Sequence, residues 1–205
     1  MCRALSETSA LSEEIELFDG LCRQLARRQP DTWAHSLRVS RYASWLAARL
    51  ELSSASLLRC QRGALLHDFG KLFMSREVHK SAPLDAQELR RIREHPGLGF
   101  DFLRRFEVLQ RFMPVVLEHH ERWDGEGYPR ALRHETISVE ARVVAIADSY
   151  DAMVSDRPYR RGMGAVHALD ELLSEAGRQF DPELVSTFVS RVAGSRLDRD
   201  ARLGA

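Results

Sequence analysis

Apolar residues recur at intervals of three and four along most of the chain, and this spacing limits the possible folds more than any other feature. Ile15, Phe18, Cys22 and Leu25 show it first, and such a period places apolar side chains on one face of a helix. We find no alternating pattern of the kind that predicts strands. The sequence therefore predicts an all-α fold of roughly eight helices. The expected helices cover about 12–28, 31–50, 54–68, 84–94, 98–105, 108–121, 139–154, 165–175 and 182–192.

Prolines and small polar residues predict where these helices begin and end. We expect Pro30 to end the first helix and Asp31 to begin the second as an N-cap residue. His95-Pro96-Gly97 should close a charged helix, because a residue before proline disfavours the helical conformation. A kink is expected at Pro114. Periodicity disappears between Arg122 and Glu135, which predicts a structured, Gly-rich loop.

A chain of 205 residues and 23.4 kDa is long enough for one domain with its own apolar core. We expect a helical N-terminal extension at 1–28, the main domain at 29–194 and a frayed polar tail at 195–205. We expect no fused regulatory domain within these residues.

Composition excludes several classes of protein. The 30 basic and 30 acidic residues balance, so no overall field favours nucleic acid or an anionic membrane. No apolar run approaches the roughly 20 residues of a membrane-spanning helix, and no export signal is visible. The three cysteines form no Cys-x-x-Cys pair, which argues against a disulfide framework or a thiolate zinc site. We therefore expect a soluble, cytoplasmic protein.

Five of the eight histidines fall at expected helix ends or on apolar faces, and each alone is more often a core or capping residue than a ligand. These five are His35, His67, His95, His119 and His120. Asp68 and Asp148 add carboxylates in apolar surroundings, where an unpaired charge is costly. A cation would satisfy both, and imidazole with carboxylate suits iron, manganese or zinc. We assign the other three histidines to the surface: His79, His134 and His167.

The order of these residues resembles the HD-GYP domain, a branch of the HD metal-dependent phosphohydrolases. The resemblance covers nearly all of residues 30–192. The matching motifs are His35, His67-Asp68-Phe69-Gly70-Lys71, His95-Pro96, His119-His120-Glu121-Arg122-Trp123-Asp124-Gly125-Glu126-Gly127-Tyr128-Pro129, Ala147-Asp148-Ser149-Tyr150-Asp151-Ala152-Met153, Asp156-Arg157-Pro158-Tyr159-Arg160 and Phe180-Asp181-Pro182.

The resemblance implies a bacterial phosphodiesterase that opens cyclic di-GMP to pGpG, and in some members continues to GMP. Residues 29–194 would be its catalytic domain. A pair of ions suits this reaction, because it neutralises phosphate charge and activates a water. The implied ligands of one ion are His35, His67, Asp68 and Asp148. Asp68 would bridge to a second ion, held by His95, His119 and His120. Two or three divalent ions are implied; we expect iron or manganese first, with zinc, nickel or magnesium also compatible.

The same resemblance implies the residues that touch the substrate. Lys71 would offer its ammonium to the phosphate or to the departing oxygen, which makes Asp68 and Lys71 the expected catalytic residues. Arg157 and Arg160 would hold phosphate or guanine; the alternative is a solvated basic turn. Gly127 permits close backbone approach and Tyr128 offers a ring for guanine to stack on, although an ordinary packed loop also explains both.

We assign Trp123 to packing. Six further arginines are assigned to solvated faces: Arg90, Arg91, Arg93, Arg104, Arg105 and Arg111.

Asp31 stands four residues before His35, where family members that hold a third ion carry Glu. Two interpretations stay open. Asp31 can be a ligand of a third ion, or only the N-cap of its helix.

Two other functions remain compatible with the sequence. One is a non-catalytic module that binds cyclic di-GMP, or docks a diguanylate cyclase (GGDEF) domain through the loop of Arg122 to Pro129. The other is a hydrolase of a different cyclic dinucleotide or nucleotide. Metal content separates the first of these from an enzyme. The oligomeric state and the controlling signal stay open.

Overall fold

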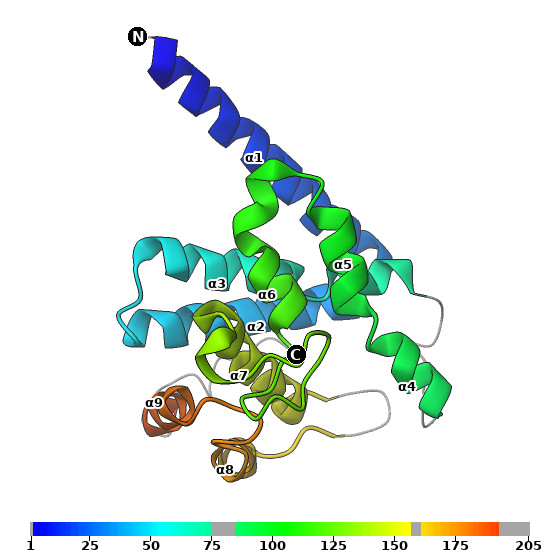
Figure 1. The fold of residues 1–205 in the computed structure, drawn as a ribbon, viewed down its shortest axis with the longest axis vertical. Coiled ribbons are helices and arrows are strands. Elements are labelled where there is room, and N and C mark those ends of the chain that lie inside the picture. The colour runs from blue at the N-terminus through cyan, green and yellow to red at the C-terminus, as the bar shows by residue number, and fades with distance from the viewer. Residues whose placement is uncertain (1, 75–84, 157–160, 193–205) are drawn as a thin grey trace.

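The protein is described by a computed structural model that covers residues 2–74, 85–156 and 161–192, with side chains from residue 13 onward except that of Arg191. Over these residues the chain is helical and contains no strand, which confirms the predicted fold class (Figure 1). The α-helices are α1 (Cys2–Arg28), α2 (Pro30–Arg49), α3 (Ser54–Leu66), α4 (Ala86–Ile92), α5 (His95–Leu103), α6 (Met113–Glu118), α7 (Val139–Val154), α8 (Ala165–Ser174) and α9 (Pro182–Val192). Three 3-10 helices join them: η1 (Phe69–Phe73), η3 (Glu107–Phe112) and η4 (His134–Thr136).

The longest helix, α1, extends well beyond the body of the molecule at its N-terminal end, whereas its later turns pack against other helices (Figure 1). Phe18, Leu21, Cys22 and Leu25 are buried there. Three of these four belong to the stripe that the spacing of three and four predicts. The stripe therefore fixes the extension to the rest of the fold.

Two apolar clusters form the core. The first joins α2 and α3 to α7, α8 and α9, with Leu46, Ile146 and Phe188 fully buried. The second joins the later half of α1 to η1, η3, α5 and α6, with Leu66 and Phe112 at its centre. Because α3 contributes to both clusters, the segment that follows it is held at the place where they meet.

Three prolines begin helices, which corrects the predictions for Pro96 and Pro114 and moves the start of the second helix from Asp31 to Pro30; the predicted end of the first helix at Arg28 is confirmed. Pro30, Pro96 and Pro114 each occupy one of the first two positions of a helix, in α2, α5 and α6. A proline lacks an N–H group, and the first turn is where a helix has no partner for it. His95-Pro96-Gly97 therefore opens α5, and α4 has already ended at Ile92.

The same correction removes one explanation of Asp31. The N-cap of α2 is Gln29, and Asp31 is an exposed acidic residue in the first helical turn. Its carboxylate there interacts favourably with the positive end of the helix dipole.

Two other boundaries matter for the residues that carry chemistry. Helix α3 ends at Leu66, two residues earlier than expected, so His67 is its C-cap and Asp68 leads into η1. Helix α7 runs over the predicted Val139–Val154, and the Ser138 hydroxyl accepts a hydrogen bond from the Ala141 N–H. None of the helices that the structure describes combines the length and the apolar character needed to cross a membrane.

Candidate metal centre

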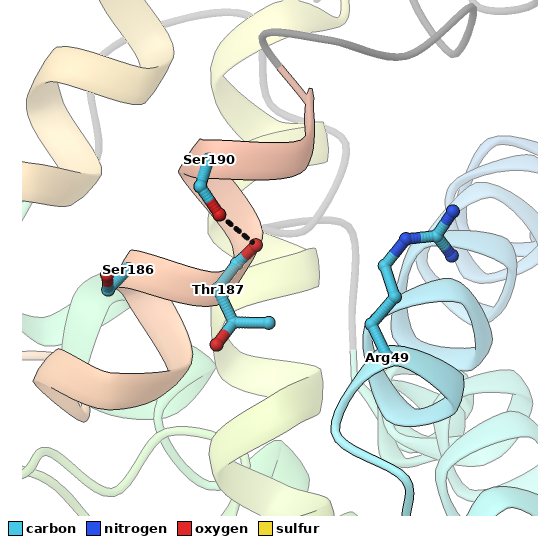
Figure 2. Close-up of a pocket in the computed structure, with 4 residues that line it drawn as sticks. All are labelled: Arg49, Ser186, Thr187 and Ser190. Carbon is cyan, nitrogen blue, oxygen red and sulfur yellow. Dashed lines mark hydrogen bonds between the residues drawn. The ribbon is translucent and has the colours of Figure 1, made fainter.

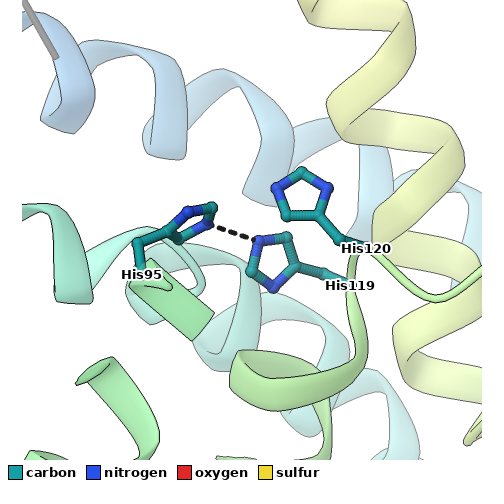
Figure 3. A group of neighbouring side chains, drawn as sticks. All are labelled: His95, His119 and His120. Carbon is teal, nitrogen blue, oxygen red and sulfur yellow. Dashed lines mark hydrogen bonds between the residues drawn. The ribbon is translucent and has the colours of Figure 1, made fainter. Parts of the chain in front are cut away.

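Seven side chains from five helix regions converge between the two clusters. Two groups of three could each hold an ion, since their ligand atoms lie within 4.8 Å of one another. The first group is His35 from α2 with His67 and Asp68. The second, shown in Figure 3, is His95 at the start of α5 with His119 and His120 after α6. Residues far apart in the sequence are thus brought together as predicted.

Asp68 lies between the two groups and presents one carboxylate oxygen to each. Its Oδ1 is 3.2 Å from His95 Nε2. Its Oδ2 is 3.4 Å from His67 Nε2 and 3.8 Å from His35 Nε2. This is the arrangement that a carboxylate bridging two ions requires.

Asp148 extends the first group from α7. Its Oδ1 is 3.0 Å from His35 Nε2. The side chains of His35 and Asp148 are 14% and 16% exposed, whereas that of Asp68 is 2% exposed. His35 and Asp148 are therefore partly open to solvent, whereas Asp68 is not.

Three of the rings are oriented by backbone carbonyls. The Nδ1 atoms of His67 and His95 lie 2.7 Å from the carbonyl oxygen three residues earlier, and that of His119 lies 3.0 Å from its equivalent. A carbonyl only accepts, so each Nδ1 carries the hydrogen and each Nε2 is left with a lone pair.

The environment of these Nε2 atoms shows whether a cation fits between them. His95 Nε2 and His119 Nε2 are 3.1 Å apart (Figure 3), a distance that requires a shared proton or a metal ion between the two nitrogens. His67 Nε2 is buried and has no hydrogen-bond partner among the described residues. An unsatisfied buried nitrogen costs about 1–3 kcal/mol. One metal ion bound to His67 and a second bound to His95 and His119 would satisfy all three nitrogens, and the donor set fits transition metals.

Burial lowers the pKa values of three of the histidine rings. It lowers the pKa of His120 to about 3 and holds that of His119 well below the ordinary value for histidine. Burial also lowers the pKa of His67, so this ring is uncharged at neutral pH. Neutral imidazole is the form that binds a metal, so these rings are ready to act as ligands at neutral pH.

For the carboxylates and His35, charges and hydrogen bonds outweigh the effect of burial on the pKa. Burial acts to raise the pKa of Asp68, but the positive charge of Lys71 holds it well below its usual range. The pKa of Asp148 is likewise low, against the effect of burial, because His35 hydrogen-bonds to it. Burial acts to lower the pKa of His35, yet hydrogen bonds to Asp148 and Asp151 raise it to about 9. Without a metal, His35 thus carries the positive charge that an ion would replace.

Lys71 projects from η1 into the first group, with its Nζ 2.6 Å from Asp68 Oδ2. The sequence predicted that Lys71 follows His67 by about one helical turn. The helix tightens to 3-10 geometry there, and the ammonium still reaches the centre.

Tyr128 lies against the second group. Its ring stacks on that of His120, with centroids 4.9 Å apart and an interplanar angle of 29°. The Arg93 guanidinium carbon lies 5.3 Å from the centroid of the Tyr128 ring. Sequence analysis placed Arg93 on a solvated face and did not predict this contact. Its position two residues before His95 was the available signal.

The loop around Tyr128 folds closely on itself. A Cβ at Gly127 would lie 2.3 Å from the Arg122 nitrogen and 2.6 Å from the Glu121 Cα atom, so only glycine fits. The buried Glu121 carboxylate accepts hydrogen bonds from the backbone N–H groups of Arg130 at 2.6 Å and Leu132 at 3.0 Å. These contacts give Gly127 a packing role, and its contact with substrate stays a prediction.

The remaining candidate residues have different outcomes. Trp123 packs its ring against the His134 ring and the Arg142 guanidinium, in agreement with its assignment. His134 and His167 are exposed, as predicted. Asp31 is exposed and belongs to neither ligand group. Three residues lie outside the described part of the chain: His79, Arg157 and Arg160.

A pocket elsewhere does not share these residues. It lies between the end of α2 and α9 and is lined by Arg49, Ser186, Thr187 and Ser190 (Figure 2). Arg49 already stacks over the Trp45 ring at 3.9 Å and hydrogen-bonds to the Trp45 carbonyl. None of its lining residues is a ligand or a charged partner of the metal groups, so we assign the chemistry to the centre described above.

Comparison with known proteins agrees with this geometry. The sequence matches the HD domain family over residues 10–184, a stretch that begins inside α1. A cyclic di-GMP phosphodiesterase of Thermotoga maritima is 36% identical over 182 residues, which cover 87% of this chain and 49% of that protein. A 3′3′-cGAMP-specific phosphodiesterase of Vibrio cholerae is 35% identical over 173 residues, which cover 83% and 33%. The chain thus spans half or less of the length of these relatives.

The fold also matches solved structures. An HDG"Y"P protein from Bdellovibrio bacteriovorus superposes with a TM-score of 0.67 at 20% identity, covering 80% of this chain and 53% of that one. At this identity the likeness concerns the fold alone.

Proposed function

The chain belongs to the HD domain family and is of its HD-GYP type; on that premise we propose that it hydrolyses cyclic di-GMP at a centre of two metal ions. One observation carries the proposal: Asp68 presents an oxygen to each of two ligand groups. A structural carboxylate needs only one set of partners. Two sets of imidazole and carboxylate ligands joined by one bridging carboxylate are what a two-metal, phosphodiester-cleaving centre uses.

Each residue of the centre has a proposed role. His35, His67, Asp68 and Asp148 hold one ion. His95, His119 and His120 hold the other, with Asp68 as the bridge. Bound ions supply Lewis acidity toward the phosphate oxygens and an activated water. We propose iron or manganese, because imidazole and carboxylate ligands without thiolate suit either metal.

Residues of the chain itself bind and orient the substrate. Lys71, whose ammonium reaches the first group, places a positive charge beside the phosphate and can donate a proton to the departing oxygen. Tyr128 forms a flat wall next to His120 against which a base can lie. We propose Arg157 and Arg160 as further phosphate or guanine contacts, and Gly127 as a close backbone contact.

The end product, pGpG or GMP, follows from how readily the linear product rebinds. A second candidate substrate is 3′3′-cGAMP, since a relative of nearly equal similarity bears that name. Both substrates share the phosphodiester chemistry and differ in one base. We further propose a GGDEF domain as a partner of the loop of Arg122 to Pro129, and a cytoplasmic location, where buried free thiols such as Cys22 and Cys60 persist.

Turnover of purified protein tests the proposal. Protein prepared without oxygen is incubated with cyclic di-GMP, 3′3′-cGAMP and cyclic di-AMP in turn, and the products are separated by chromatography. We expect cyclic di-GMP to be opened fastest, Asp68→Ala to abolish turnover, and His134→Ala, a change at an exposed histidine, to leave it unchanged. Protein that carries two ions and opens none of the three would contradict the proposal.

A further inference from the structure

Asp151 is a buried carboxylate beside the metal centre for which the proposed chemistry has no use. It stands three residues after Asp148 in α7, and its side chain is 1% exposed. Its Oδ2 accepts a hydrogen bond from His35 Nδ1 at 2.7 Å. Arg38 donates to both of its oxygens, from Nε to Oδ1 at 2.7 Å and from Nη2 to Oδ2 at 3.0 Å.

The position of His35 in its helix explains why a carboxylate is needed. The carbonyls that orient the rings of His67, His95 and His119 all belong to the last turn of a helix. Helix-end carbonyls have no partner within the helix and are free to accept. His35 lies inside α2, where the nearby carbonyls are occupied by the helix itself. Its ring must therefore be oriented by a group from another element.

Asp151 supplies that group from α7, and Arg38 fixes its direction. Two parallel hydrogen bonds from a guanidinium hold a carboxylate in one plane. The Ser155 hydroxyl donates a second hydrogen bond to Oδ1 at 3.2 Å. With both oxygens engaged, Asp151 faces His35 Nδ1 and is kept from turning into the centre as a ligand.

We infer that Asp151, held by Arg38, is the positioning residue of His35 and sets the affinity of the first ion separately from that of the second. This inference rests on the proposed metal centre. A carboxylate behind a ligating imidazole fixes its orientation and makes it a stronger donor, and loss of such a partner typically lowers metal affinity about 10–100-fold. Two rings of the second group, those of His95 and His119, are instead oriented by neutral carbonyls.

Metal affinity measured by chelator competition tests the inference, with Mn²⁺ added to metal-free protein. Asp151→Asn keeps the shape of the side chain and removes its charge. We expect one of two ions to bind about 10–100-fold more weakly and the other to keep its affinity. Arg38→Gln, a change at a partly exposed residue, should weaken the same ion by a smaller factor and serves if Asp151→Asn does not fold.

Asp181 provides the matched control. It is also a buried aspartate paired with an arginine, since Arg142 Nη1 lies 2.6 Å from its Oδ2, and no histidine contacts it among the described residues. Asp181→Asn should lower the melting temperature and leave both metal affinities unchanged.

Two results would overturn the inference. The first is wild-type affinity for both ions in Asp151→Asn, or in Arg38→Gln if Asp151→Asn does not fold. The second is a loss of metal affinity in Asp181→Asn equal to that in Asp151→Asn. Absence of turnover in a wild-type protein that binds two ions would contradict the proposed activity alone.

Discussion

Replacing Gly70 by alanine should break a backbone contact on which both ligand groups depend. Gly70 lies in η1 between Asp68 and Lys71, and a Cβ there would be 1.9 Å from the His95 carbonyl oxygen and 2.7 Å from the Gly99 nitrogen. Ordinary contact begins at 3.4 Å, so η1 and α5 would have to separate by about 1.5 Å. Overpacking costs about 1–3 kcal/mol. Backbone cannot rotate away as a side chain does, so we expect a loss near 3 kcal/mol.

The same separation should lower activity. His95 Nε2 and Asp68 Oδ1, now 3.2 Å apart, lie on the two segments that must move. A displacement of about 1 Å in a catalytic centre can lower the rate roughly 100-fold.

Urea unfolding followed by circular dichroism measures the stability, and cyclic di-GMP turnover measures the activity. Gly97→Ala is the control, because a Cβ at Gly97 meets nothing within 4 Å and alanine in a helix is favoured over glycine by up to about 1 kcal/mol. If Gly70→Ala unfolds at the wild-type urea concentration with an unchanged slope, the close approach of η1 and α5 is refuted.

Three further predictions concern the same centre. The metal-free protein should be most stable near pH 6.5: below it stability falls, because His120, with its pKa lowered to about 3, must stay neutral while the unfolded chain takes up a proton. Above pH 6.5 stability falls again, because His35, with a pKa of about 9, gives up its stabilising charge as the pH rises through that value. A urea midpoint that stays constant from pH 4 to 10 would refute both predicted decreases in stability. Arg93→Ala should raise KM for cyclic di-GMP about tenfold with full metal content. Arg105→Ala, which removes an exposed guanidinium 5.9 Å from the Phe102 ring, should leave KM unchanged. Equal kinetics in both variants would show that Arg93 has no role beyond a solvated surface residue. If Asp31 holds a third ion, Asp31→Ala lowers bound metal by about one equivalent, and full occupancy would end that hypothesis.

Most helices could be predicted from the sequence because apolar spacing and caps agree along them. Helix α7 has both Ser138 as its cap and a continuous apolar run, and its predicted bounds are those observed. The prolines could not be assigned in the same way. A proline is excluded from a helix interior but is equally compatible with the residue after one helix and the first turn of the next, and only packing decides between them.

The candidate metal ligands could be selected from the sequence because their order in the chain carries the family pattern. Their partners were not, because each depends on contacts between elements far apart in the sequence. Asp151 reaches His35 only when α7 lies beside α2, and its neighbour Asp148 already explained the acidic character of that helix face. Arg93 stands in a strongly charged segment, which is typical of a solvated helix face. Only the fold brings its guanidinium over the Tyr128 ring.

The central claim is that two ions held through Asp68 are needed for hydrolysis. Titration of metal-free protein with Mn²⁺ or Fe²⁺ under nitrogen, with cyclic di-GMP turnover measured at each step, tests it most directly. We expect no turnover in the metal-free protein and a rise that reaches its maximum only once two equivalents are bound. Full turnover with one equivalent or none would contradict the account.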